Sequence, residues 1–108
     1  MTNLDEYLEI RDTIVRPALE ELKEEYEAQG YQCRIGTQKP QRRTMPRAIS
    51  FSITDPNNIL GTVSIFLSDG GWVIFNKLNV LYSSRLHLDE ITPDRVKEKI
   101  REALEYKE

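Results

Sequence analysis

The sequence contains few of the residues on which metal sites and nucleophilic catalysis depend. Its 108 residues include one cysteine, Cys33, and one histidine, His87. A single cysteine excludes an internal disulfide and a multi-thiolate zinc site, and a single histidine excludes a histidine-rich metal site. Cys33 and His87 could form a nucleophilic pair only if the fold brought them together. Because Cys33 alternates with polar neighbours, we expect it to pack in the core, and we expect no catalytic, metal-binding or cofactor-binding residue.

Long apolar runs are also lacking. No stretch is apolar over the roughly 18 residues that a membrane-spanning helix requires. The N-terminal "MTNLDEYLEI" carries acids where a secretion signal carries basic and then apolar residues. Together with the single cysteine, these absences predict a cytoplasmic protein without a membrane partner.

Acidic residues are missing from one region of an otherwise acidic chain. The net charge is -3, yet there is no Asp or Glu between Glu27 and Asp55. Within that region the stretch "KPQRRTMPR" at 39–47 carries four cations, which are Lys39, Arg42, Arg43 and Arg47. Positive charge is therefore concentrated in the middle of the chain, between two acidic ends.

Apolar residues with helical spacing occur in those two acidic ends. From Leu4 to Tyr26 they recur at steps of three and four residues, which is typical of the buried face of a long helix. Pro17 lies inside this pattern and predicts a kink or a break, because it lacks a backbone N–H donor. A second helix is predicted in "ITPDRVKEKIREALEY", where Thr92 is a suitable N-cap and Pro93 the first helical residue.

The middle of the chain alternates apolar and polar residues, which indicates strands. Three strands are predicted in "YQCRIGT", "AISFSIT" and "GTVSIFL", and a fourth in "WVIFNKLNV". The stretch "SDGG" at 68–71 favours a tight hairpin, and "DPNN" at 55–58 favours a turn. We therefore predict one α+β domain over residues 1–108 with the order α-β-β-β-β-α. Its antiparallel meander sheet carries both terminal helices on one face.

The alternation assigns strand residues to the two faces of this sheet. We predict that the helices cover the face bearing Ile49, Phe51, Val63, Ile65, Trp72 and Ile74. The open face would then bear Ala48, Ser50, Ser52, Thr62, Ser64, Phe66, Val73 and Phe75. It would lack the charges that are usual on a solvated sheet, and it would hold an apolar cluster. We favour a homodimer or protein-partner interface; the alternatives are a solvated polar face with an exposed aromatic pair, and a base-stacking platform.

The basic stretch at 39–47 is predicted to be a surface loop, because Pro40 and Pro46 border it and disfavour regular structure. Its guanidinium groups could bind the phosphates of DNA or RNA, or the acidic surface of a protein. The favoured interpretation of the loop is a solvated one that offsets the acidic helices, because phosphate binding normally requires a broader basic surface. Binding of nucleic acid comes second and binding of an acidic protein third.

The predicted order of helix, strands and helix is similar to that of the double-stranded-RNA-binding domain. In that family, a strand hairpin loop and the second helix contact RNA, and the basic loop here would occupy a comparable place. This chain has an extra strand and a longer, acidic first helix, and its second helix opens with "TPDRVKEK". The similarity covers the order of elements only and assigns no functional residue.

Together these patterns predict a non-enzymatic interaction module. We expect a homodimer, or a module that binds another protein through the open face or the basic loop. The residues expected to contact the partner are Phe66, Val73, Phe75, Lys39, Arg42, Arg43 and Arg47. The alternative is a nucleic-acid-binding protein that uses the basic loop 39–47.

Overall fold

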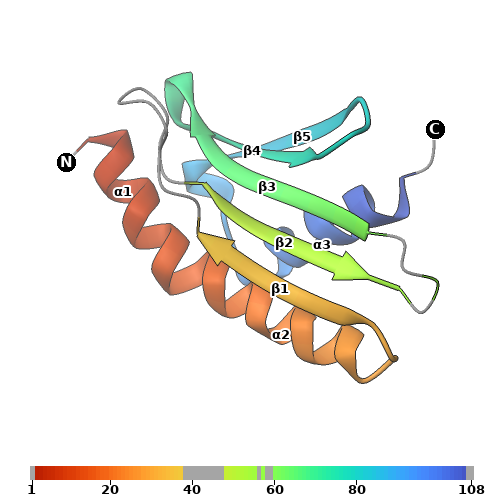
Figure 1. Ribbon diagram of the computed structural model, residues 1–108. Helices are drawn as coiled ribbons and strands as arrows, with labels where there is room; N and C mark the ends of the chain where they lie inside the picture. Colours follow the sequence, from red (N-terminus) through yellow and green to blue (C-terminus); the bar gives the residue numbers. More distant parts are fainter. Residues whose placement is uncertain (1, 38–47, 56, 58–59, 107–108) are drawn as a thin grey trace.

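The structure is a computed structural model that describes residues 2–37, 48–55, 57 and 60–106 (Figure 1). Three α-helices and five strands form these parts of the chain. The helices are α1 (Asn3–Ile10), α2 (Arg16–Glu27) and α3 (Pro93–Glu105). The strands are β1 (Gln32–Thr37), β2 (Ile49–Thr54), β3 (Leu60–Ser68), β4 (Trp72–Lys77) and β5 (Tyr82–His87).

The long N-terminal helix changes its winding just before Pro17, as the sequence predicts. Residues Arg11–Val15 form a π-helical turn between α1 and α2, and the N–H of Arg16 bonds to the carbonyl of Arg11. Pro17 cannot donate to a preceding carbonyl, so the regular hydrogen-bond ladder cannot continue through this turn. At the other end of the chain, Thr92 caps α3 by accepting a hydrogen bond from Arg95 N at 3.2 Å. Pro93 opens that helix, also as predicted.

The strands form one open antiparallel sheet in the order β1-β2-β3-β4-β5, so the predicted α+β meander is confirmed. The sheet has a fifth strand that the sequence did not predict. The expected fourth strand ends at Lys77, the chain turns over residues 78–81, and Lys77 pairs with Tyr82. Asn79 adopts a positive φ of 69° in this turn, a conformation that Asn tolerates better than most residues. Because the turn "LNVL" contains neither Gly nor Pro, the sequence gives little sign of it.

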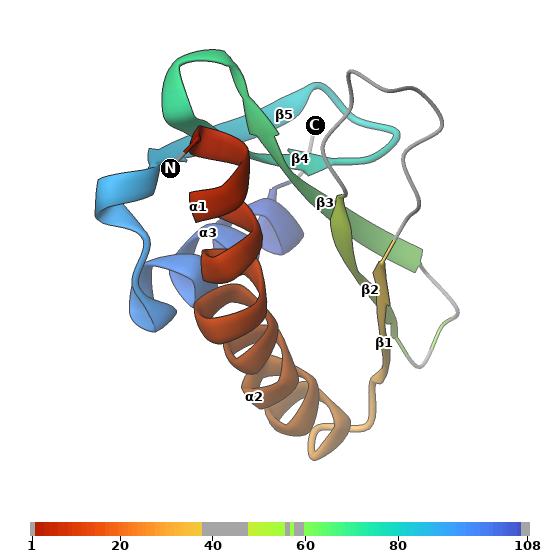
Figure 2. The same ribbon diagram turned by 90° about the vertical axis from the view of Figure 1, so that its left-hand side faces the viewer.

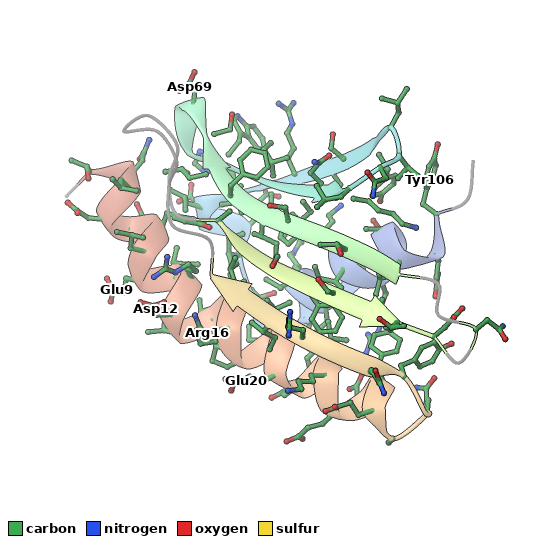
Figure 3. The ribbon with its side chains drawn as sticks, viewed as in Figure 1. Glu9, Asp12, Arg16, Glu20, Asp69 and Tyr106 are labelled. Atoms are coloured by element: carbon green, nitrogen blue, oxygen red, sulfur yellow. The ribbon has the colours of Figure 1, made fainter. Side chains whose placement is uncertain are left out.

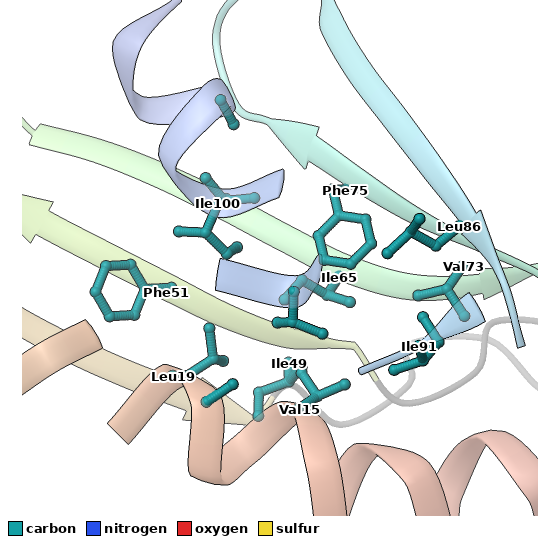
Figure 4. Packing of buried hydrophobic residues seen from close by; sticks show 14 of the residues in the cluster. Val15, Leu19, Ile49, Phe51, Ile65, Val73, Phe75, Leu86, Ile91 and Ile100 are labelled. Carbon is teal, nitrogen blue, oxygen red and sulfur yellow. The ribbon is translucent and has the colours of Figure 1, made fainter. Parts of the chain in front are cut away.

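All three helices lie on one side of the sheet (Figure 2). Side chains from both layers form a single apolar cluster between them (Figure 4). Tyr7 of α1 is part of this cluster, and its hydroxyl donates to the carbonyl of Ile65 at 3.2 Å. Burial raises the pKa of Tyr7 to about 12. The cluster therefore packs the helices against the inner face of the sheet, which is the face opposite the open one.

The predicted faces of β4 are wrong. Val73 and Phe75 are completely buried in the core, whereas Trp72 and Ile74 lie on the open face. The pairing of strands sets this assignment: Phe75 lies opposite Ile65, which is itself a core residue. The connection Asp69–Gly71 places Trp72 opposite Ser68 and thereby fixes the phase of the strand. A one-residue difference in phase exchanges the two faces.

Candidate binding surface on the open sheet face

The open face consists of side chains that point away from the helices, in rows that cross the strands. One row is Phe66, Ile74 and Arg85, and the row beside it is Ser68, Trp72 and His87. Small and polar side chains occupy the rows next to these, at Gly36, Ser50, Ser64, Asn76 and Ser83, and then at Arg34, Ser52 and Thr62. The surface thus has an aromatic end and a polar middle. Phe66, Trp72 and Ile74 are half-buried, so part of each apolar side chain remains accessible.

Arg85, Trp72 and His87 form a stacked group at the aromatic end. The guanidinium carbon of Arg85 lies 4.2 Å from the ring centroid of Trp72, in a cation–π contact. The His87 ring meets Trp72 edge-on, with centroids 5.2 Å apart and ring planes at 87°. Arg85 is exposed although it makes this contact. The group therefore presents a flat cation and an indole together.

Hydrogen bonds from the β3–β4 connection and from the residues after β5 hold His87 in place. Asp89 N donates to His87 Nδ1 at 3.4 Å, which leaves Nε2 to donate to the carbonyl of Gly70 at 3.1 Å. The His87 backbone N–H in turn donates to Glu90 at 3.0 Å. Gly71 adopts a φ of 81°, and a Cβ there would lie 3.0 Å from the His87 ring nitrogen. The position of the His87 ring at the aromatic end is therefore fixed by hydrogen bonds and by close packing against Gly71.

The open face carries cations but no acids at its described strand positions. Arg34 and Arg85 are both exposed, and neither forms an ion pair with another described residue. Asp69, at the β3–β4 connection, projects away from the sheet (Figure 3). The Asp89 carboxylate, just after β5, lies 3.3 Å from His87 Nδ1 at the rim of the face. The strand positions themselves thus carry positive charge without acids beside Arg34 and Arg85.

The structure places the predicted contact residues in different parts of the molecule. Phe66 lies on the open face as expected, but Val73 and Phe75 are core residues and cannot contact a partner there. Lys39, Arg42, Arg43 and Arg47 lie outside the described residues. The sequence analysis missed Trp72, Ile74 and Arg85 as surface residues because it misassigned the phase of β4 and did not recognise β5. With β5 recognised, the alternation of "YSSRLH" would have placed Arg85 and His87 on the face opposite that of Leu86.

Cys33 and His87 do not form a nucleophilic pair. They lie on β1 and β5, the opposite edges of the sheet, with three strands between them, and at opposite ends of the register. Burial, with a smaller contribution from Glu27, raises the pKa of the Cys33 thiol, so the reactive thiolate is disfavoured. Among the described residues, no group of His, Cys, Asp and Glu could hold a metal ion. In the same part of the chain, no helix has the length and apolar character needed to cross a membrane.

A second exposed apolar feature lies at the β4–β5 turn. Leu81 is 95% exposed, and Leu78 in the same turn is 40% exposed. This turn joins the ends of β4 and β5 that are remote from Trp72 and His87. The apolar turn is therefore separate from the aromatic end of the open face.

Comparison of the chain with known protein families, curated proteins and solved structures finds no match.

Proposed function

We propose that the chain is a non-enzymatic interaction module that binds a negatively charged partner through the open face of its sheet. The observation that carries this proposal is the pair of exposed cations, Arg34 and Arg85, which form no ion pair with a described residue, on a face whose described strand positions carry no acid. Half-buried aromatic side chains lie on the same face and supply apolar contact area. Surfaces that combine aromatic and arginine side chains are typical of binding interfaces. A cytoplasmic location is part of the proposal and is based on the single cysteine.

The helical side is less suited to a negatively charged partner. Glu9, Asp12 and Glu20 project along the outer side of α1 and α2 (Figure 3). Lys97 and Arg101 on α3 are already paired with Glu21 and Glu25 on α2. An anionic partner would be repelled by the acids and would have to compete for these cations. The open face offers neither obstacle.

Ion-exchange chromatography on heparin, a polyanion without bases, tests the proposal. The double variant Arg34→Glu with Arg85→Glu should elute at lower salt than the wild type, because both cations are reversed. The control, Arg95→Glu with Lys99→Glu, changes the net charge equally but acts on α3. It should elute close to the wild type. Equal shifts for both variants would show that net charge matters and the open face does not.

A homodimer is the second candidate function. The small residues Gly36, Ser50 and Ser64 would allow another layer to approach the sheet closely. Two copies stacked face to face would, however, bring their cations together without any acid from a described strand position. Such like-charge contacts are costly, which is why we rank the anionic partner first.

Sedimentation velocity tests the homodimer. A dimer through the open face should dissociate when Ile74 is replaced by Asp, whereas Leu81→Ser should dissociate a dimer that forms through the β4–β5 turn. Neither side chain belongs to the buried core. A wild type that is monomeric at high micromolar concentration would exclude this candidate and leave the anionic-partner proposal standing.

A further inference from the structure

We infer that the anionic partner is single-stranded nucleic acid, bound with its bases on Trp72, Phe66 and Arg85. This inference rests on the proposed function and specifies the chemistry of the partner. It follows from three features of the open face: a stacking surface at one end, hydrogen-bonding groups in the middle, and cations at both edges.

The stacking surface is the group formed by Trp72 and Arg85. Nucleobases stack on exposed aromatic rings and on the planar guanidinium of arginine. Arg85 lies over the Trp72 ring at 4.2 Å and is itself exposed, so its outer face is available to a base. Phe66 lies in the row beside Trp72, separated from Arg85 only by Ile74. Two flat surfaces are therefore close enough to be used by neighbouring bases.

The middle of the face can hydrogen-bond a sugar–phosphate chain. Ser52, Thr62, Ser64, Asn76 and Ser83 lie side by side on the three central strands and β5. Hydroxyl and amide groups of this kind commonly contact phosphate and sugar oxygens. No carboxylate stands among them to repel a phosphate. This part of the face is consequently compatible with a polyanion along its length.

The two cations are far apart. Arg34 is on β1 and Arg85 is on β5, so four strand spacings, or about 19 Å, separate them across the sheet. A single inorganic phosphate can meet only one of them. An extended chain with regularly spaced phosphates can reach both and place its bases on the aromatic end.

Other anionic partners satisfy only part of this arrangement. An acidic peptide would pair with Arg34 and Arg85 but would gain little from the stacked indole and guanidinium. A DNA or RNA duplex keeps its bases stacked on one another, so they cannot reach Trp72 or Phe66. Among these partners, an unpaired strand alone offers free base faces together with a row of phosphates long enough to reach both Arg34 and Arg85.

Fluorescence of Trp72, the only tryptophan of the chain, can test the inference directly. We would titrate the wild type with oligodeoxythymidine of about 12 nucleotides, a length within the range that a single-strand-binding domain covers. We expect saturable quenching that weakens with salt. An abasic strand of the same length should leave the fluorescence unchanged and bind more weakly. A matched duplex should also bind more weakly, because its bases are not free.

Substitutions then separate stacking from charge, with affinities measured by anisotropy of a labelled oligonucleotide. Trp72→Leu should weaken binding by about 5- to 150-fold, the range found when one stacking aromatic is removed. Trp72→Phe retains a ring and should restore most of the affinity. Tyr106→Leu, the control, removes an aromatic that packs against Tyr82 beside the C-terminal end of α3. It should have little effect on binding, and circular dichroism would confirm that each variant is folded.

Two results would overturn the inference. No binding of the oligonucleotide at low salt is one. The other is equal binding of oligothymidine, abasic strand and poly-glutamate that survives Trp72→Leu, which would indicate an acidic polypeptide as the partner. The proposed function fails separately, when reversal of Arg34 and Arg85 leaves heparin retention equal to that of the α3 control.

Discussion

The two sides of this molecule use their charges in opposite ways. On the helical side, α2 and α3 are joined by ion pairs, of which Arg101–Glu25 has an N–O distance of 2.8 Å. On the open sheet face, Arg34 and Arg85 have no acidic partner among the described residues. Charges that are paired within the chain are poorly available to a partner, whereas unpaired cations on an acid-free face remain available. The open face is therefore the better candidate for binding an anion, because its cations are unpaired within the described chain as well as positive.

A single strand, β4, contributes to both sides. Val73 and Phe75 point into the core, while Trp72 and Ile74 point to the open face. Adjacent residues of similar hydrophobicity thus have different roles, one set stabilising the fold and the other available for binding. The following predictions test this division, beginning with the largest expected effect.

The strongest test replaces neighbouring residues of β4. Phe75→Ala should lower the free energy of unfolding by about 3–5 kcal/mol, because it removes a completely buried aromatic ring. Ile74→Ala, the matched control, should cost only about 1 kcal/mol, since its side chain is partly solvated. Chemical denaturation measures both values. Equal losses would mean that the faces of β4 are assigned incorrectly.

Tyr7 should make the stability of the helical side depend on alkaline pH. Burial raises its pKa from 10.0 to about 12, so the folded state retains the phenolic proton to higher pH than the unfolded chain does. The free energy of unfolding should therefore fall between about pH 10 and pH 12, by about 2–3 kcal/mol. Denaturation at several pH values, with Tyr7→Phe as the control that lacks the ionisable group, measures the contribution. An identical pH dependence in the two proteins would contradict it.

The cations of the basic stretch 39–47 provide a further test of whether unpaired positive charge contributes to oligonucleotide binding. If it acts together with the open face, replacing Arg42, Arg43 and Arg47 by Ala should reduce the slope of log affinity against log salt by about 2.1 on a single strand. The α3 control, with Arg95, Lys99 and Arg101 replaced by Ala, removes the same charge and should leave the slope nearly unchanged. Salt titrations of oligonucleotide binding measure both slopes. An unchanged slope for the first variant would show that the loop does not contact the strand.

The smallest effect concerns the ion pairs of the helical side. A double-mutant cycle on Arg101 and Glu25 should give a coupling of about 0.2–1 kcal/mol, because both side chains are solvated. Salt should weaken this coupling. Neither single variant should alter oligonucleotide binding. A coupling of several kcal/mol would mean that the pair stabilises the fold far more than solvated ion pairs usually do.

Much of the fold could be predicted from local patterns. The helical spacing between Leu4 and Tyr26 corresponds to α1 and α2, and the influence of Pro17 follows from its missing N–H donor. Thr92 and Pro93 mark the start of α3 for similarly local reasons. The fifth strand was missed because the preceding turn depends on Asn79 without a glycine or proline. Strand pairing, rather than local sequence, defines β5.

The sequence by itself determined the α+β class, the positions of the helices, the period of the strands and the separation of acidic ends from a basic middle. Only the tertiary structure decided which side chains of β4 form the core. A strand that is apolar on both sides satisfies a two-residue period in either phase, so its sequence cannot distinguish Val73 and Phe75 from Trp72 and Ile74. Pairing with β3, set by the connection Asp69–Gly71, resolves the choice and places Trp72 beside Arg85.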